Sequence, residues 1–391
     1  MATNSMTIEQ VSTVLNTIMK QATGVNGIGN YAGNSFITVA QTALQTGYDP
    51  IMSAISQVLS DTIFSMRNYT AKFSPLRADT MRYGNMVRKL NVADWDSQNN
   101  AAYSLTDGES VDMYEVKLNT ILQTNFYGGI TWERQSTTFK NQLNVAFNNA
   151  NEFGSFYSMI LTKNNNQIQQ IHETLARGLI VNLIATIITE NSGYRVIKLL
   201  TDYNNETGLE LTKEDVYKPD NFPAFMAWAA ARIERIKRLL TERSTIYHTN
   251  VTGKTITRHT DYRDQFMFLY APIEFDLNMR ALSMLFNDDK VKLGYNELVS
   301  YWQSIQTPDT INQTPVYMDA TGAVKTADAA VNKSNVFALI MDRDATGYTI
   351  MDEHQNTTPM NAKGEYWNTF YKWVHRYWMD NSENAVVLLL E

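Results

Sequence analysis

The sequence contains no cysteine. This excludes a disulfide framework, thiolate metal sites and a cysteine nucleophile, and it fits a protein that folds in a reducing cytoplasm. Positive charge is in deficit as well, since 33 Lys and Arg residues face 40 Asp and Glu residues, a formal net charge of −7. No net positive field therefore draws the whole molecule to DNA or to an anionic membrane, and any contact with DNA must be local or repulsive.

Signals for export and membrane insertion are missing. The N-terminal stretch MATNSMTIEQVSTVLNTIMK has no basic segment followed by a continuous apolar one, so no secretory signal is predicted. The longest strongly apolar run, Leu179 to Ile188, is interrupted by Asn182 and falls short of the roughly 20 residues that cross a bilayer. We therefore expect no membrane partner.

Signatures of enzymes are also absent. The five histidines are scattered, with no HExxH spacing, and no GxSxG or GxxxxGKS/T motif occurs. The glycines from Gly24 to Gly33 follow a predicted helix and not a strand, which favours a flexible connector over a nucleotide-binding loop. Three acidic pairs are interpreted as turn or helix-cap residues rather than cation ligands: Asp94 with Asp96, Asp288 with Asp289, and Asp342 with Asp344. We expect no catalytic residue, no cofactor and no metal, hence a protein that is not an enzyme.

What is present is a globular composition, with 44% hydrophobic residues over 391 positions. This rules out disorder throughout and allows two or three domains, or one large domain with arms. Helical spacing of apolar residues predicts amphipathic helices over residues 1 to 66. It also predicts one long helix, or two nearly collinear ones, from Phe153 to about Asn191, and a second from Asn221 to Leu240. A helix of about 38 residues would be about 57 Å long.

The second half alternates short strands with helices. Apolar runs predict strands at 265–270, 336–341, 348–351 and 385–390, and a helix at 276–286. Residues 194–220 are polar and turn-rich, and residues 307–333 favour an exposed hairpin or loop. The fold class is therefore α+β and not doubly wound.

Residues 103 to 134 have a period of two. Polar and apolar side chains alternate imperfectly from Met113 to Thr124, which predicts a long two-stranded excursion. Two strands alone are marginally stable in water, so this ribbon must lie on another surface, in its own subunit or in a neighbouring one. Gly128 and Gly129 then mark a point where the chain can bend or approach another backbone closely.

Aromatic residues crowd between Tyr366 and Trp378. As a strand they would occupy both faces and would be buried on both sides or pack against a partner. Tyr366, Phe370, Trp373 and Tyr377 also match helical spacing, so the element type stays open. A sugar-stacking platform is the alternative functional interpretation of this block.

Several short stretches of the sequence follow one another in a distinctive order: Trp132 to Arg134, Phe153 to Phe156, Phe268 to Phe286, Ile350 to Asp352, Asn361 to Asn368, Tyr371, Trp373 to His375, and Asn384 to Val387. In content and order these stretches resemble the major capsid proteins of small short-tailed phages. Together they span roughly residues 101 to 391, with gaps at 194–220 and 307–333.

The resemblance implies the Hong Kong 97-like capsid fold. Its parts would be an N-terminal arm (1–100), an extended two-stranded loop (101–135), a peripheral domain with a long spine helix (136–215), an axial domain (216–345), and a segment returning to the peripheral domain (346–391). It also implies a virion location after assembly in the host cytoplasm. The implied partners are further copies in hexamers and pentamers, the portal and other head proteins, and packaged double-stranded DNA held without sequence specificity.

The extended loop is the expected contact with a neighbouring subunit. Its expected contact residues are Tyr114, Val116, Leu118, Phe126, Tyr127 and Trp132. The expected hinges are Gly128 and Gly129, with the loop from Gly24 to Gly33 as a further candidate. Two other functions stay open at this point: the shell of an encapsulin-like compartment, which shares the fold, and an aromatic-rich carbohydrate-binding protein.

Overall fold

The computed structural model describes residues 71–78, 86–94, 103–114, 116, 118–127, 129–140, 150–190, 193–251, 253, 255–276 and 293–391. Three predictions lie outside these residues: the helices over 1–66, the loop from Gly24 to Gly33, and nearly all of the helix at 276–286. Gly128 also lies outside them.

The chain forms two compact units. The first comprises Met1–Gly84, Gly128–Leu175 and Tyr348–Arg376. The second comprises Asn85–Tyr127, Ala176–Gly347 and Tyr377–Glu391. One boundary therefore falls at the glycine pair that the sequence marks as a bend.

A three-stranded sheet forms the first unit. Its order is β12–β13–β3, and β13 pairs antiparallel with β3. The strands are β12 (Thr346–Thr357), β13 (Tyr366–Met379) and β3 (Ile130–Phe139). The aromatic block is thus a strand: Trp367, Tyr371 and Trp373 are buried, while Tyr366 is only half-buried. A sugar-stacking platform needs exposed rings, and Trp367, Tyr371 and Trp373 are buried, so the carbohydrate interpretation is not favoured.

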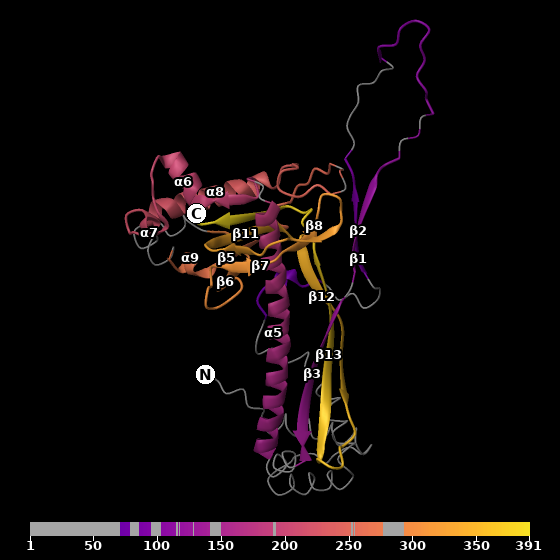
Figure 1. Cartoon of the computed structure of the whole chain (residues 1–391), viewed down its shortest axis with the longest axis vertical. Helices are drawn as coiled ribbons and strands as arrows, with labels where there is room; N and C mark the ends of the chain where they lie inside the picture. Colours follow the sequence, from indigo (N-terminus) through magenta and orange to yellow (C-terminus); the bar gives the residue numbers. More distant parts are fainter. Residues whose placement is uncertain are drawn as a thin grey trace. The chain divides into compact units, whose positions relative to one another are not determined.

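Among the described residues, helix α5 (Ala150–Glu190) packs on this sheet (Figure 1). Helix α5 has 41 residues, which confirms one continuous helix rather than two. Within the first unit its Ile168 is buried against Tyr371 and Trp373, whose rings stack 6.3 Å apart. A short 3₁₀ turn, η1 (Ser74–Leu76), adds buried Leu76 to the core.

The second unit contains a five-stranded sheet in the order β4–β14–β11–β5–β6. The strands are β4 (Val196–Lys198), β14 (Ala385–Leu389), β11 (Val336–Asp342), β5 (Gln265–Tyr270) and β6 (Glu297–Val299). The central strands are continuous apolar runs because both faces of the sheet are covered. The predicted strands at 265–270, 336–341 and 385–390 are confirmed.

The described residues of the second unit form four short or medium helices: α6 (Leu199–Thr207), α7 (Lys213–Val216), α8 (Phe222–Leu239) and α9 (Ala271–Asp276). Helix α8 confirms the prediction, with Pro223 in its first turn. The prediction of turns over 194–220 is wrong, since this stretch forms β4, α6 and α7. Helix α6 was not predicted because its sequence is mostly polar and it buries only Leu199, Leu200 and Tyr203.

Three further strand pairs complete the second unit, all antiparallel. They are β7 (Ile311–Gln313) with β10 (Val331–Lys333), β8 (Val316–Met318) with β9 (Val324–Thr326), and β1 (Met86–Val92) with β2 (Ile121–Tyr127). The first two confirm a hairpin region at 307–333. The Asn182 side chain, which interrupts the apolar run of α5, bonds both the amide and the carbonyl of Val316 at 2.9 and 2.8 Å.

Candidate functional site

Strands β1 and β2 form a two-stranded ribbon, and residues 93–120 connect them as the ribbon loop. Figure 1 shows β1 and β2 side by side, with residues 103–114 beyond their ends. The two-stranded excursion is therefore confirmed, but its predicted limits are wrong. Strand β2 begins only at Ile121, and its partner is β1, upstream of the predicted ribbon. Among residues 113–120, those that the structure describes (113, 114, 116 and 118–120) form no strand, because an alternating pattern needs a neighbouring strand edge to become one.

The ribbon loop exposes large apolar side chains. Three of the expected contact residues lie here: Tyr114 is 81% exposed, Val116 81% and Leu118 88%. Other exposed apolar residues of the loop and of the adjoining strand positions are Tyr103, Leu105, Val111, Met113, Ile121 and Val92. Exposed apolar side chains gathered in one segment are typical of a contact surface.

The remaining expected contact residues lie elsewhere. Phe126 and Tyr127 belong to β2, opposite Val87 and Met86, and Phe126 is half-buried. Trp132 belongs to β3 of the first unit, where it pairs with Trp373. Trp132 is therefore not part of the ribbon, because the chain leaves the ribbon at the glycine pair.

Gly129 makes the close backbone approach that the sequence predicts. A Cβ at this position would lie 3.0 Å from the carbonyl oxygen of His375, which is tighter than nine in ten real Cβ contacts. The absence of a side chain lets β3 begin against β13.

A buried polar turn lies in the same unit as the ribbon. Its residues Asp380, Asn381, Ser382, Glu383 and Asn384 connect β13 to β14, and every one of them is buried. Burying five consecutive polar residues costs free energy unless each finds a hydrogen-bond or ionic partner. The polar turn finds them on five other segments of the second unit.

The ribbon supplies one of these partners. Nζ of Lys89, on β1, lies 3.0 Å from Oδ2 of Asp380 and also pairs with Glu383. Arg258 pairs with Glu383 from another direction and donates to the Ser382 hydroxyl at 3.1 Å. The Ser382 hydroxyl and amide donate in turn to Asp380, at 2.6 and 2.9 Å.

The two asparagines of the polar turn form hydrogen bonds with other parts of the second unit. The Asn381 side-chain amide donates to Glu190 at 2.7 Å and to the Met318 carbonyl at 2.8 Å. The Asn384 amide donates to the Thr260 hydroxyl, which donates to Asp342 at 2.6 Å. The polar turn thus ties the end of α5, the β8–β9 pair and strand β11 to the base of the ribbon.

The charges of this cluster depend on one another. Burial lowers the pKa of Lys89, but Asp380 and Glu383 outweigh it, so this pKa lies above its ordinary value. Burial raises the pKa of Asp380, but Lys89 and Ser382 outweigh it, so this pKa lies below its ordinary value. Burial raises the pKa of Glu383, with partial compensation by Lys89 and Arg258. Lys89 therefore keeps Asp380 ionised in a buried position.

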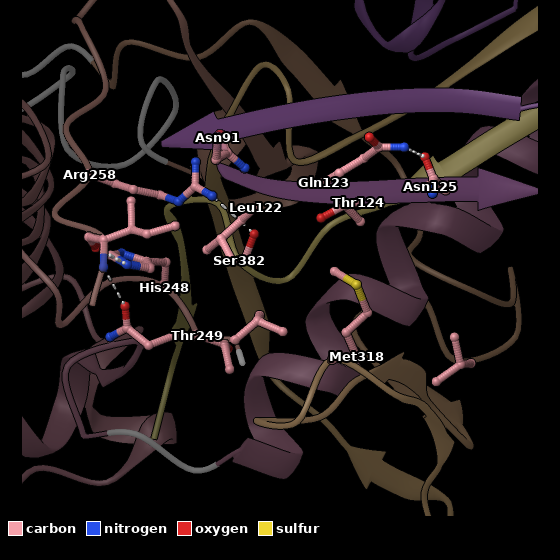
Figure 2. Close-up of a pocket in the computed structure, with 15 residues that line it drawn as sticks. Asn91, Leu122, Gln123, Thr124, Asn125, His248, Thr249, Arg258, Met318 and Ser382 are labelled. Atoms are coloured by element: carbon pink, nitrogen blue, oxygen red, sulfur yellow. Dashed lines mark hydrogen bonds between the residues drawn. The ribbon is translucent and has the colours of Figure 1, made fainter. Parts of the chain in front are cut away.

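A cavity of about 170 Å³ separates part of the ribbon from the body of the second unit. Figure 2 shows Asn91 and the β2 residues Leu122 to Asn125 on one side, and His248, Arg258 and Ser382 facing them. Met318 lines the cavity from β8. Over these residues the ribbon does not pack closely on the body, so close packing does not fix its position there.

The sequence of the chain matches the family model described as Phi29-like phage major capsid protein, over residues 15–389. The chain belongs to this family. No curated protein sequence matches the chain.

Two solved structures share the fold of this capsid protein. A chain in the capsid structure of Staphylococcus phage Andhra has a TM-score of 0.50 and 10% identity, over 83% of this chain and 86% of that chain. A chain in the structure of the head fiber and inner core protein gp22 of native bacteriophage P68 has a TM-score of 0.51 and 12% identity, over 83% and 87%. The Hong Kong 97-like fold expected from the resemblance is confirmed.

As a member of this family, the capsid protein is a structural component of the virion and assembles with copies of itself into the shell. Its helix segment Thr162–Glu190 has the length and mean hydropathy, 1.4, of a membrane-crossing helix, but 67% of its most apolar window is buried within the protein. Core helices meet the same criterion, and we assign α5 to the core of the capsid protein.

The candidate acidic pairs of the capsid protein have protein partners where the structure describes them. Asp94 pairs with Arg243 at 2.8 Å. Asp342 accepts from Thr260 and from the Asp344 amide. In the described ranges, no group of three or more metal-ligating side chains comes together.

Two of the scattered histidines meet in the core of the first unit. The His172 ring, on α5, and the His375 ring, on β13, lie edge to face with centroids 4.9 Å apart, and both are buried. Within the described residues, Nε2 of His172 and both ring nitrogens of His375 have no hydrogen-bond partner. Burial and the positive charge of Arg77 lower the pKa values, to about 3 for His172 and about 4 for His375. Sequence spacing could not reveal this pair because 203 residues separate its members.

Proposed function

We propose that this capsid protein builds the hexamers and pentamers of an icosahedral or prolate phage head, and that the ribbon loop buries its apolar side chains on a neighbouring copy. The exposure of Tyr114, Val116 and Leu118 carries this proposal. Burying three such side chains contributes roughly 5–8 kcal/mol, before the entropic cost of association is subtracted. Repeated around a capsomer, a contact of this size is sufficient to close a ring.

The glycine pair is the proposed hinge between the ribbon and the first unit. Support comes from the boundary between the two compact units, which falls between Tyr127 and Gly128. One sequence has to fit both hexamers and pentamers, so a bend at this point would absorb the difference in curvature. The division into N-terminal arm, extended loop, peripheral domain and axial domain belongs to the same proposal.

The other proposed partners are packaged double-stranded DNA on the inner face and the portal with other head proteins. The net charge of −7 supports a DNA contact without sequence specificity, because repulsion keeps packaged DNA mobile against the wall. We further propose that the capsid protein acts through repeated contacts alone, without a chemical step.

Assembly of purified protein tests the ribbon-loop contact. Leu118→Ser and Tyr114→Ser should leave the thermal unfolding of the unassembled chain unchanged, because both side chains are exposed, and should abolish or strongly reduce shell formation. Sedimentation velocity and electron microscopy measure the yield of shells. The matched control is Ile305→Ser, which removes an apolar side chain 76% exposed elsewhere in the second unit. Normal shells from the double variant Tyr114→Ser/Leu118→Ser would refute the contact.

A further inference from the structure

We propose that Lys89 is a positioning residue for assembly, and that its ionic contact with the buried polar turn holds the ribbon in the orientation that a neighbouring copy accepts. This inference rests on the proposed contact of the ribbon loop with a neighbour. It assigns to Lys89 and Asp380 a role in presenting that loop, without contact of their own to the neighbour.

The strand geometry of β1 selects Lys89 for this role. Successive side chains of a strand point to opposite faces, so the adjacent cations Arg88 and Lys89 cannot both face the body. Arg88 is exposed, and Lys89 is directed inward to Asp380 and Glu383. The neighbours follow the same alternation, since Leu90 and Val92 are exposed while Asn91 is half-buried.

Charge balance makes the contact of Lys89 hard to replace. Glu383 has a second cation, Arg258. Asp380 has only Lys89 as a cationic partner among the residues that the structure describes, and its side chain is fully buried. Moving the ribbon away would therefore leave Asp380 as a buried, unpaired carboxylate, which is strongly unfavourable.

The surroundings of the ribbon explain why its position depends on Lys89. The cavity lies under Leu122 to Asn125, so close packing does not hold β2 at that place. A second anchor exists at the end of β1, where Asp94 accepts from Arg243 and from the Thr257 hydroxyl at 2.5 Å. That anchor is open to solvent, which screens it, whereas the contact of Lys89 with Asp380 is largely desolvated.

Distance measurement on the unassembled full-length chain tests the positioning role directly. The chain has no cysteine, so nitroxide labels at Val92→Cys on the ribbon and Glu210→Cys on the body report one distance without background. We expect one narrow distance distribution in the parent chain and in Arg88→Met. Lys89→Met should add a second, broader population, and Lys89→Arg should restore the narrow one.

Assembly kinetics give the second measurement. If the ribbon of Lys89→Met is correctly placed about a tenth of the time, the apparent affinity between copies of this variant falls about tenfold. Arg88→Met should assemble at the parent rate. Asp380→Asn keeps the side-chain shape and removes the charge. It replaces Lys89→Met as the test variant if Lys89→Met does not fold. It should show the same second distance population.

A narrow, unchanged distance in both Lys89→Met and Asp380→Asn would overturn the positioning role, as would equal loss of assembly in Arg88→Met. The two proposals fail separately. Failure of the parent chain to form shells, or normal shells without Tyr114 and Leu118, refutes the proposed loop contact, whereas the distances of the unassembled chain decide the role of Lys89 without any shell.

Discussion

Two segments of the second unit depart from the usual distribution of side chains in opposite ways. The polar turn from Asp380 to Asn384 is buried, and the ribbon loop around Tyr114 to Leu118 exposes apolar side chains. The polar turn is tolerated because each of its side chains has a partner within the same subunit. The exposed apolar side chains of the ribbon loop have no such cover among the described residues, and in the proposed function other copies supply it.

The difference separates two kinds of requirement in one capsid protein. The polar turn serves the fold of the single subunit, and damage to it should lower the stability of the unassembled chain. In the proposed function the ribbon loop serves the shell, so loss of its exposed apolar side chains should change assembly alone. Lys89 connects the two, because it lies on the ribbon and pairs with the polar turn.

The largest expected effect is on the polar turn. Asp380→Ala takes from Lys89 one of its two described carboxylate partners and removes the acceptor of the Ser382 hydroxyl, so the free energy of unfolding should fall by about 3–5 kcal/mol. Urea unfolding of the unassembled chain measures it. The matched control, Asp107→Ala in the exposed ribbon loop, should change it by less than about 0.5 kcal/mol. Equal changes in the free energy of unfolding for the two substitutions would contradict the difference drawn between the polar turn and the ribbon loop.

The histidine pair of the first unit sharpens the comparison, because it is buried and polar like the turn but has unpartnered nitrogens. Both pKa values are lowered in the folded state, so between pH 6.5 and about 4 the unfolded chain binds more protons than the folded one. The stabilisation is complete above pH 6.5 and is lost as pH falls. By pH 5 each ring should cost about 2 kcal/mol of unfolding free energy.

Unfolding curves of the parent chain and of His172→Phe/His375→Phe measured from pH 8 to pH 5 check this expectation. The charges that act on the rings are Arg77 and the other ring of the pair. The double variant should lose much of the acid sensitivity of its unfolding free energy. Some sensitivity should remain, because carboxylates elsewhere still titrate. Parallel pH curves for parent and variant would contradict the lowered pKa values of the two rings.

The smallest expected effect concerns Gly129, at the end of the ribbon. Gly129→Ala places a methyl group against the His375 carbonyl and should lower the free energy of unfolding by about 1–3 kcal/mol. Gly193→Ala is the control, because nothing lies within 4 Å of its Cβ position. Calorimetry of the two variants compares them. Should both prove equally stable, the close approach of β3 to β13 would not require glycine.

Much of the fold could be predicted from periodicity. Helix α8 and strands β5, β11 and β14 lie where their apolar patterns place them, and α5 is the continuous helix that its spacing favoured. These elements bury one stripe or two faces in their own subunit, so the local pattern and the final structure agree. Helix α6 was missed because it is short and polar on most of its surface.

The candidate site was predicted only in part. The sequence indicates that a ribbon near residue 120 needs an external surface, and Tyr114, Val116 and Leu118 are exposed as that requires. The first strand of the ribbon, β1, was missed, because nothing in the sequence of residues 86–92 indicates that it pairs with β2. The polar turn was missed as well, because a run of Asp, Asn, Ser and Glu has the composition of a solvated loop.

By itself the sequence determined the α+β class, the long helical stretch and the lack of thiol chemistry, because these depend on composition and on local periodicity. The tertiary structure alone decided which polar residues are buried and which cation faces inward at Arg88 and Lys89. Lys89 and Asp380 are 291 positions apart, and only the folded chain brings their opposite charges to 3.0 Å.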